Sequence, residues 1–71
     1  MSNTTESATY TVTGMTCAHC VASVTEEVSE IEGVHDVAVD LGTGALTFHS
    51  DQPVSRAAVD AAVREAGYQL R

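Results

Sequence analysis

Two cysteines three residues apart, Cys17 and Cys20, are the residues of this sequence best suited to chemistry. Thiolates are soft ligands that suit Cu(I), and two of them satisfy this ion in a near-linear site. Structural zinc normally takes four ligands, and the sequence has no second cysteine pair. A closed zinc site would therefore require His19 together with another group, or a second molecule. The pair accordingly predicts a Cu(I) site between Cys17 and Cys20.

The pattern around this pair predicts a junction between a strand and a helix. Residues 8–13 are rich in β-branched and aromatic side chains that alternate with polar ones, which is typical of a short strand. A loop follows over 14–18, and a helical period begins at residue 19 or 20. Cys17 then lies in the loop and Cys20 in the first helical turn. The unpaired amides and partial positive charge of a helix start stabilise thiolates over thiols.

The remaining pattern predicts an α+β fold of the split βαβ, or ferredoxin-like, type. In this βαββαβ arrangement, a four-stranded antiparallel sheet carries both helices on one face. Residues 1–7 are polar and are expected to form a flexible leader, which leaves 8–71 as one domain. The expected elements are a strand over 8–13, a helix with an apolar stripe at Val21, Val24, Val28 and Ile31, a strand over 37–41, a strand including Leu46 and Phe48, a helix over 56–66 capped by Ser55, and a strand over 68–71.

The segment Gly14–Cys20, which reads GMTCAHC, resembles the motif of the heavy-metal-associated domain family. That family includes soluble copper chaperones, the N-terminal modules of copper-exporting P-type ATPases, and mercury-binding proteins. The resemblance covers residues 8–71 and extends to Gly33-Val34 and to Ala66-Gly67-Tyr68. It implies the ferredoxin-like fold, Cys17 and Cys20 as the metal ligands, and a soluble copper chaperone of the bacterial or archaeal type.

Four neighbours of the pair are expected to support the site. The resemblance implies that Met15 packs beneath the metal loop, where a flexible thioether fills gaps well. Thr16 is a candidate helix cap or loop-bracing hydroxyl. His19 is either a third ligand or hydrogen-bond donor to the thiolates, or an exposed spacer, and its position between two inward-facing cysteines favours the spacer. The resemblance places Tyr68 near the metal, where it either shields the thiolates with its hydroxyl or packs in the core with that hydroxyl in water.

Charge excludes some partners. Ten acidic residues against three arginines and no lysine give a formal charge of -7, which repels nucleic acids and anionic lipid surfaces. Four glutamates along the first helix, Glu26, Glu27, Glu30 and Glu32, form either a docking face or, as such patterns favour, solvated surface. No apolar run approaches the roughly 20 residues needed to cross a bilayer, and no secretion signal is visible. We therefore expect no membrane insertion and a cytoplasmic location, where thiols stay reduced.

These features predict a Cu(I) metallochaperone and not an enzyme, because the sequence shows no paired base and nucleophile. The resemblance implies that copper passes by thiolate ligand exchange to the CxxC module of a copper-transporting P-type ATPase. A copper-responsive repressor is another expected recipient. Copper held by four thiolates of two chains would give a copper-bridged homodimer.

Three other interpretations stay open. The chain could be the excised N-terminal metal-binding domain of such an ATPase, although the starting methionine and polar leader argue against this. It could be a mercury-binding protein, although such proteins usually work in the periplasm. It could be a redox dithiol, but the longer βαβ pattern with aromatic and proline neighbours that accompanies a thioredoxin-type CxxC is missing. His35, expected in a loop, and His49, in a strand, have no spacing that links them to the cysteines and receive no role.

Overall fold

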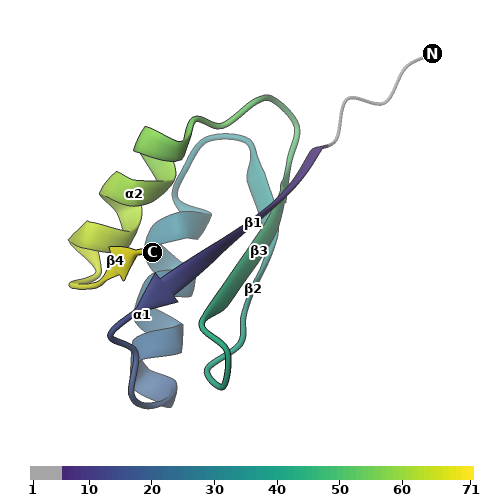
Figure 1. Cartoon of the computed structure of the whole chain (residues 1–71). Coiled ribbons are helices and arrows are strands. Elements are labelled where there is room, and N and C mark those ends of the chain that lie inside the picture. Colours follow the sequence, from purple (N-terminus) through teal and green to yellow (C-terminus); the bar gives the residue numbers. More distant parts are fainter. Residues whose placement is uncertain (1–5) are drawn as a thin grey trace.

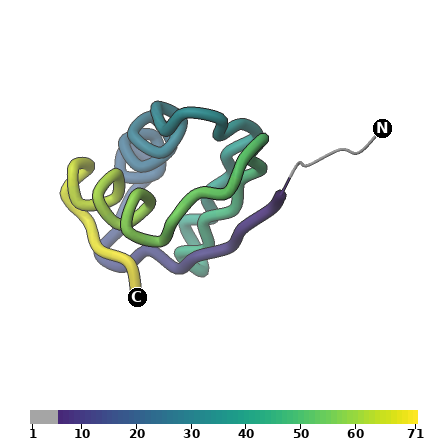
Figure 2. The backbone as a smooth tube through the Cα atoms, turned by 90° about the horizontal axis from the view of Figure 1, so that it is seen from above, coloured from purple at the N-terminus to yellow at the C-terminus, as the bar shows by residue number. Residues whose placement is uncertain are grey.

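The computed structural model describes residues 6–71 and contains the predicted order of elements. The strands are arranged in the order β2-β3-β1-β4, and each neighbouring pair is antiparallel. Both helices cover the same face of this sheet (Figure 1; Figure 2), which confirms the predicted ferredoxin-like arrangement. The elements are β1 (Glu6–Thr13), α1 (Ala18–Ser29), β2 (Val34–Val39), β3 (Ala45–Ser50), α2 (Arg56–Glu65) and β4 (Gln69–Leu70).

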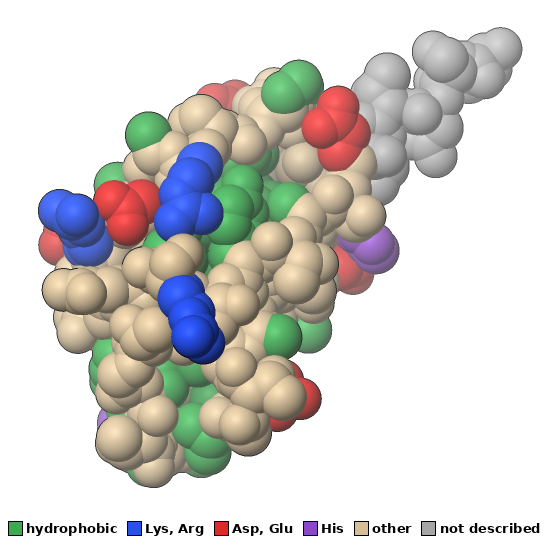
Figure 3. Space-filling model, viewed as in Figure 1, with side chains coloured by type: hydrophobic (Ala, Val, Ile, Leu, Met, Phe, Trp, Pro, Cys, Tyr) green, Lys and Arg blue, Asp and Glu red, His purple; other side chains and the backbone are tan. Residues whose placement is uncertain are grey.

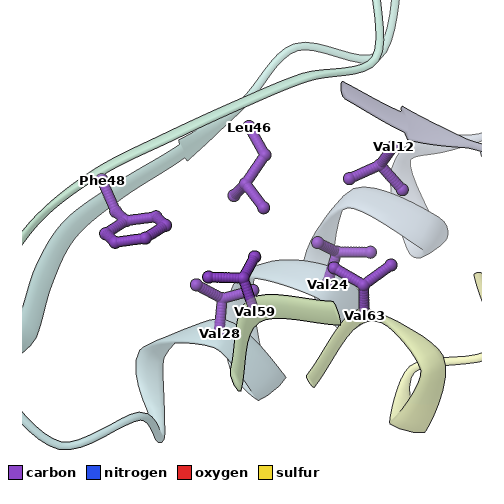
Figure 4. Packing of buried hydrophobic residues seen from close by; sticks show 7 residues of the cluster. All are labelled: Val12, Val24, Val28, Leu46, Phe48, Val59 and Val63. Carbon is purple, nitrogen blue, oxygen red and sulfur yellow. The ribbon is translucent and has the colours of Figure 1, made fainter. Parts of the chain in front are cut away.

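The hydrophobic core lies between the sheet and the two helices. In Figure 4, Leu46 and Phe48 point from β3 toward valines of α1 and α2. Because side chains alternate along a strand, Thr47 and His49 project from the opposite face, which the helices do not cover. The buried apolar side chains of this cluster are Val12, Val24, Val28, Leu46, Phe48, Val59 and Val63.

Strand β1 lies between β3 and β4 in the sheet and pairs with both. Its first part pairs with β3, from Glu6 opposite Ser50 to Thr11 opposite Ala45. Its last two residues pair with β4 on the other side, and the Arg71 amide donates to the Thr11 carbonyl at 2.7 Å. The loop that follows β1 therefore lies beside the C-terminal strand, at the end of the molecule opposite to the start of β1 (Figure 1).

The helices begin close to the predicted residues. Ser55 caps α2, because its side chain accepts a hydrogen bond from the Ala58 amide at 3.1 Å, and this prediction is confirmed. Helix α1 begins at Ala18, one or two residues earlier than predicted, because Cys17 occupies the N-cap position with an extended backbone. The Cys17 side chain makes no capping hydrogen bond, so its sulfur is left for other interactions.

Two strands begin earlier than predicted. Strand β1 starts at Glu6, so the final two residues of the expected leader over 1–7 belong to the sheet, while residues 1–5 lie outside the described residues. Strand β2 covers Val34–Val39 and not 37–41. Leu41, expected to alternate inward, lies beyond the strand and is 39% exposed.

A β-bulge explains the difference in β2. The pairing with β3 shifts between His35 and Ala38, and Asp36 has a φ of 56°, in the left-handed region. The extra residue interrupts the alternation of inward and outward side chains. The alternation in the sequence is therefore regular only from residue 37, whereas the strand begins at Val34. His35 is consequently a strand residue opposite His49. Hydrogen bonds with these two histidines hold the pKa of the Asp36 carboxyl below its ordinary value.

The described helices include none that is long and apolar enough to cross a membrane.

The three arginines lie in α2 and at the C-terminal end, and Figure 3 shows them gathered on one side of the molecule. The guanidinium of Arg56 lies over the Tyr10 ring, 5.8 Å from its centroid, and Arg64 pairs with Asp60 at 3.1 Å. Positive charge is therefore confined to the α2 side of this acidic protein.

Replacing Gly44 with alanine should destabilise the fold more than replacing Gly67. Both glycines have positive φ, +79° and +97°, and a left-handed alanine costs about 1–2 kcal/mol. At Gly44 the new Cβ would also lie 2.5 Å from the Val12 carbonyl oxygen, whereas at Gly67 nothing lies within 4 Å. Urea unfolding followed by circular dichroism measures both losses. Equal losses would contradict the close approach of the β2–β3 hairpin to β1.

Candidate metal site

The two cysteines lie where β1 passes into α1, and their sulfur atoms are 3.5 Å apart. Cys17 is exposed at the helix N-cap, whereas Cys20, in the first turn, is only 7% exposed. Both thiols are free. The sulfurs thus converge on one point, one from the surface and one from the interior.

The packing of α1 fixes the position of Cys20. Cys20, Val24 and Val28 follow one another at intervals of four and form the buried stripe of the helix. Both valines are fully buried, and burying each contributes roughly 1.5–3 kcal/mol. Rotating the helix to expose Cys20 would remove that contribution. Val21 and Ile31, which the sequence also places on the stripe, are only partly buried.

Several hydrogen bonds converge on the Cys20 sulfur and favour its thiolate. The largest effect comes from the Tyr68 hydroxyl, and the Thr16 amide adds a further bond at 3.5 Å. Together with smaller contributions from Cys17, and despite the opposing effect of burial, they lower the pKa of Cys20 from 9.0 to about 6. In turn, donating to Cys20 raises the pKa of the Tyr68 hydroxyl above its ordinary value. Cys20 is therefore mainly a thiolate at neutral pH.

The four residues predicted to support the cysteine pair differ from one another in burial and in the groups that they contact. Met15 and Tyr68 are partly buried and pack against the core, and the Tyr68 hydroxyl interacts with the Cys20 thiol. Thr16 is not the helix cap, because Cys17 holds that position. Its hydroxyl lies 4.0 Å from the Cys20 sulfur. His19 is exposed, as the spacer interpretation expects.

Sequence reasoning missed the hydrogen bond from the Thr16 backbone amide to Cys20. Every non-proline residue carries such an amide, so the identity of residue 16 gives no signal for it. The bond depends on how the loop folds back over the first turn of α1. The sequence singled out the threonine hydroxyl instead, which lies farther from the sulfur than the amide does.

The donor set suits a soft ion with few ligands. Among the residues that the structure describes, the one group of three or more His, Cys, Asp or Glu side chains close enough to share an ion lies elsewhere, at His35, Asp36 and His49. At metal–sulfur lengths of about 2.3 Å, a linear arrangement spans about 4.6 Å, so the sulfurs must separate from 3.5 Å to take an ion in line. Rotation of the exposed Cys17 side chain can supply this movement while Cys20 stays in place.

A family model for the heavy-metal-associated domain matches residues 9–69 of this chain. The match covers most of the sequence, so the protein belongs to the heavy-metal-associated domain family. This confirms the resemblance carried by the GMTCAHC segment.

Relatives of similar sequence include one small protein and several transporters. The chain is 41% identical over 59 residues to the COP-associated protein of Helicobacter felis, covering 83% of this chain and 89% of the relative. It is 42% identical over 62 residues to copper-transporting ATPase 1 of Rhizobium meliloti, and 40% identical over 62 residues to the zinc/cadmium/lead-transporting P-type ATPase of Shigella sonnei. Each ATPase match covers 87% of this chain but 8% of the transporter.

Solved structures of similar fold include small proteins matched over their whole length. A proposed copper-ion-binding protein of Bacillus anthracis superposes with a TM-score of 0.84 at 34% identity, covering 99% of this chain and 100% of that protein. The CopZ metallochaperone gives a TM-score of 0.84 at 27% identity, covering 93% of this chain and 100% of its own. The chain therefore has the fold of these proteins over nearly its whole length.

Replacing Tyr68 with phenylalanine should raise the pKa of Cys20 back toward its ordinary value, because the strongest hydrogen bond to the thiolate is lost. The rate of alkylation at Cys20, followed against pH by mass spectrometry of its peptide, measures this pKa in reduced, metal-free protein. Tyr10→Phe is the matched control, since Tyr10 stacks on Phe48 with ring centroids 6.1 Å apart. An unchanged Cys20 profile in Tyr68→Phe would leave that tyrosine a packing role only.

The lowered pKa of Cys20 makes the stability of the metal-free protein depend on pH. Cys20 has a folded pKa of about 6 against an ordinary value of 9.0, so the unfolded chain binds more protons between these values. The free energy of unfolding should therefore gain a contribution as pH rises from about 6 to 9, and lose it as pH falls through about 6. Urea unfolding under reducing conditions should show this rise in the native sequence and a flatter profile in Cys20→Ser. Parallel profiles would contradict it.

Proposed function

We propose that this protein binds Cu(I) between Cys17 and Cys20 and carries it through the cytoplasm to the metal-binding domain of a copper-transporting P-type ATPase. One observation carries the proposal: two free thiols lie 3.5 Å apart, one exposed and one buried. The buried thiol is held as a thiolate by Tyr68 and Thr16, which gives a fixed anchor for a cation. The exposed thiol leaves one side of that cation open to a second protein.

Transfer would proceed by exchange of thiolate ligands. A cysteine thiolate of the acceptor forms a bond to copper on the exposed Cys17 side and gives a three-coordinate intermediate. One bond from copper to the carrier then breaks, and repetition of the step moves the ion completely. Copper stays Cu(I) throughout, and each bond formed replaces one broken. The ion is never released to water, so the barrier to transfer stays low although the ion is tightly held.

The choice of copper over zinc rests on the number and type of donors. Two thiolates satisfy Cu(I), whereas zinc in a structural site takes four ligands. The described residues place no third His, Cys, Asp or Glu ligand beside this pair. Copper is also named among the similar proteins, including an ATPase and a proposed copper-ion-binding protein. A zinc-transporting relative of 40% identity makes zinc the competing ion.

The same site would also suit the metal-binding domain of a larger transporter, because this chain is 42% identical to part of a copper-transporting ATPase. We favour a carrier because the similar proteins include the CopZ metallochaperone and a COP-associated protein. A copper-responsive repressor is a further proposed acceptor, and copper shared by two chains would give a dimer. We propose no catalytic activity. Among residues 6–71, the interactions of Cys17 and Cys20 involve Thr16, Tyr68 and one another and include no histidine or acid as a base.

Competition between Cu(I) and Zn(II) tests the proposal. Reduced protein, titrated with each ion against a chelator of matched strength, should bind one Cu(I) per chain and hold it far more tightly than Zn(II). Cys17→Ser and Cys20→Ser should each abolish tight copper binding, because a single thiolate leaves the ion half coordinated. His19→Gln is the control and should bind copper as the native sequence does.

Two results would overturn the proposal. One is stronger binding of zinc than of copper under matched competition, and the other is tight copper binding that survives either serine substitution. The carrier role is tested separately by mixing copper-loaded protein with an isolated metal-binding domain of a copper-transporting ATPase. Copper should appear on the acceptor even when a chelator that captures free ions is present. Capture of the ion by the chelator would contradict direct transfer.

A further inference from the structure

A second group of metal-ligating side chains lies at the other end of the sheet from the cysteines. His35, Asp36 and His49 present ligand atoms that all lie within 4.8 Å of one another. The group adjoins the beginning of β1, because His49 is paired with Ser7. The cysteine loop follows Thr13, at the opposite end of that strand. The two groups therefore cannot share one ion.

The two histidines are held side by side by the pairing of β2 with β3. His35 lies directly opposite His49, and directly opposed residues project from the same face of a sheet. Their ring centroids are 6.0 Å apart. His49 is flanked by the buried residues Phe48 and Ser50, so its ring points away from the helices. The side chains of His35 and His49 are 40% and 50% exposed, which leaves both rings accessible to an ion from solvent.

The β-bulge brings a carboxylate to the same face. Neighbouring residues of a regular strand project to opposite faces, so Asp36 would ordinarily point away from His35. With its φ of 56°, Asp36 instead places Oδ2 3.0 Å from Nδ1 of His35 and 3.4 Å from Nδ1 of His49. Aspartate is one of the few non-glycine residues that adopt this conformation readily, so the bulge can hold the carboxylate in this position.

A second carboxylate orients one of the rings. Nε2 of His35 lies 3.1 Å from Oδ1 of Asp51, while Nδ1 of the same ring faces Asp36. Histidines that bind metals commonly donate their other ring N–H to a carboxylate, which fixes the tautomer and leaves the ligating nitrogen unprotonated. In His35, Asp51 is such a carboxylate partner of Nε2, and Nδ1 donates its proton to Asp36 in the metal-free protein and becomes the ligating atom when that proton is lost.

From this geometry we propose a second metal site, in which Nδ1 of His35, Nδ1 of His49 and the Asp36 carboxylate hold a divalent cation of the zinc type. Two imidazoles and a carboxylate suit borderline divalent ions and not Cu(I). Zinc lies about 2.0–2.2 Å from such atoms in tetrahedral sites, which places the ligand atoms roughly 3.3 Å from one another. The observed separations of 3.0 and 3.4 Å from Asp36 to the two histidines match this value. Water would complete the coordination, and the cation would replace the protons in the histidine–aspartate contacts.

The test uses protein without its thiolates, so that it does not depend on the proposed copper function. The double variant Cys17→Ser/Cys20→Ser, freed of metal, is titrated with Zn²⁺ against a chromophoric chelator. We expect one Zn²⁺ per chain. Adding His35→Gln or His49→Gln should weaken binding by more than about tenfold, since each removes a ligand. Adding His19→Gln, the matched control, should leave it unchanged.

A further variant, Asp36→Asn, separates loss of binding from loss of folding. Asparagine tolerates the left-handed conformation, so the bulge and the unfolding midpoint should be retained while zinc binding weakens. No zinc uptake by the double-serine protein would overturn the proposal, as would uptake that survives the substitutions at His35, Asp36 and His49. Copper binding by His35→Gln in the protein that retains both cysteines should equal that of the native sequence, so failure of one site is distinguishable from failure of the other.

Discussion

Two antiparallel residue pairs, Val12 with Leu70 and Thr13 with Gln69, join the last strand to the end of the first. This short pairing carries Tyr68, the residue just before β4, to the loop that follows β1, where its hydroxyl bonds to Cys20. The bond makes the largest contribution to stabilising a thiolate that is largely withdrawn from water. Without it, the loop amides and the Cys17 thiol would have to offset the cost of burying a charge. The chemistry of the site thus depends on the pairing of chain segments that are distant in the sequence.

The unequal burial of the two sulfurs would reconcile retention of an ion with the proposed transfer. Cys20 lies on the buried stripe of α1, and moving it would disturb valines that are themselves fully buried. Cys17 belongs to the exposed N-cap and makes no capping bond, so it can move without cost to the core. A site closed by four protein ligands would hold an ion firmly but leave no open position for an incoming thiolate. The fold therefore offers one fixed and one adjustable donor.

The two ends of the sheet present donors of different chemical type. Sulfur donors follow the end of β1, while imidazole and carboxylate groups adjoin its beginning, beside the bulge in β2. The seven residues of β1 from Ser7 to Thr13 span six rises of the strand and separate the two groups by roughly 20 Å. Neither group therefore perturbs the other strongly across water and salt. Because soft and borderline ions prefer different donors, the two proposed sites would keep two classes of ion apart on a single small sheet.

The sequence alone determined the order of the elements, the ferredoxin-like architecture, the cap at Ser55 and the meeting of Cys17 with Cys20. Each of these follows from periodicity or spacing within a short stretch of chain. Only the tertiary structure decided that Tyr68 bonds to Cys20, that a Thr16 amide does so too, and that His35 lies opposite His49. The tertiary structure also determined the bulge at Asp36. Because of this bulge, β2 begins earlier than the sequence predicts, and a carboxylate lies between two histidines. These features depend on which strands pair, in which register and with which backbone angles, and no local pattern of residue types specifies that.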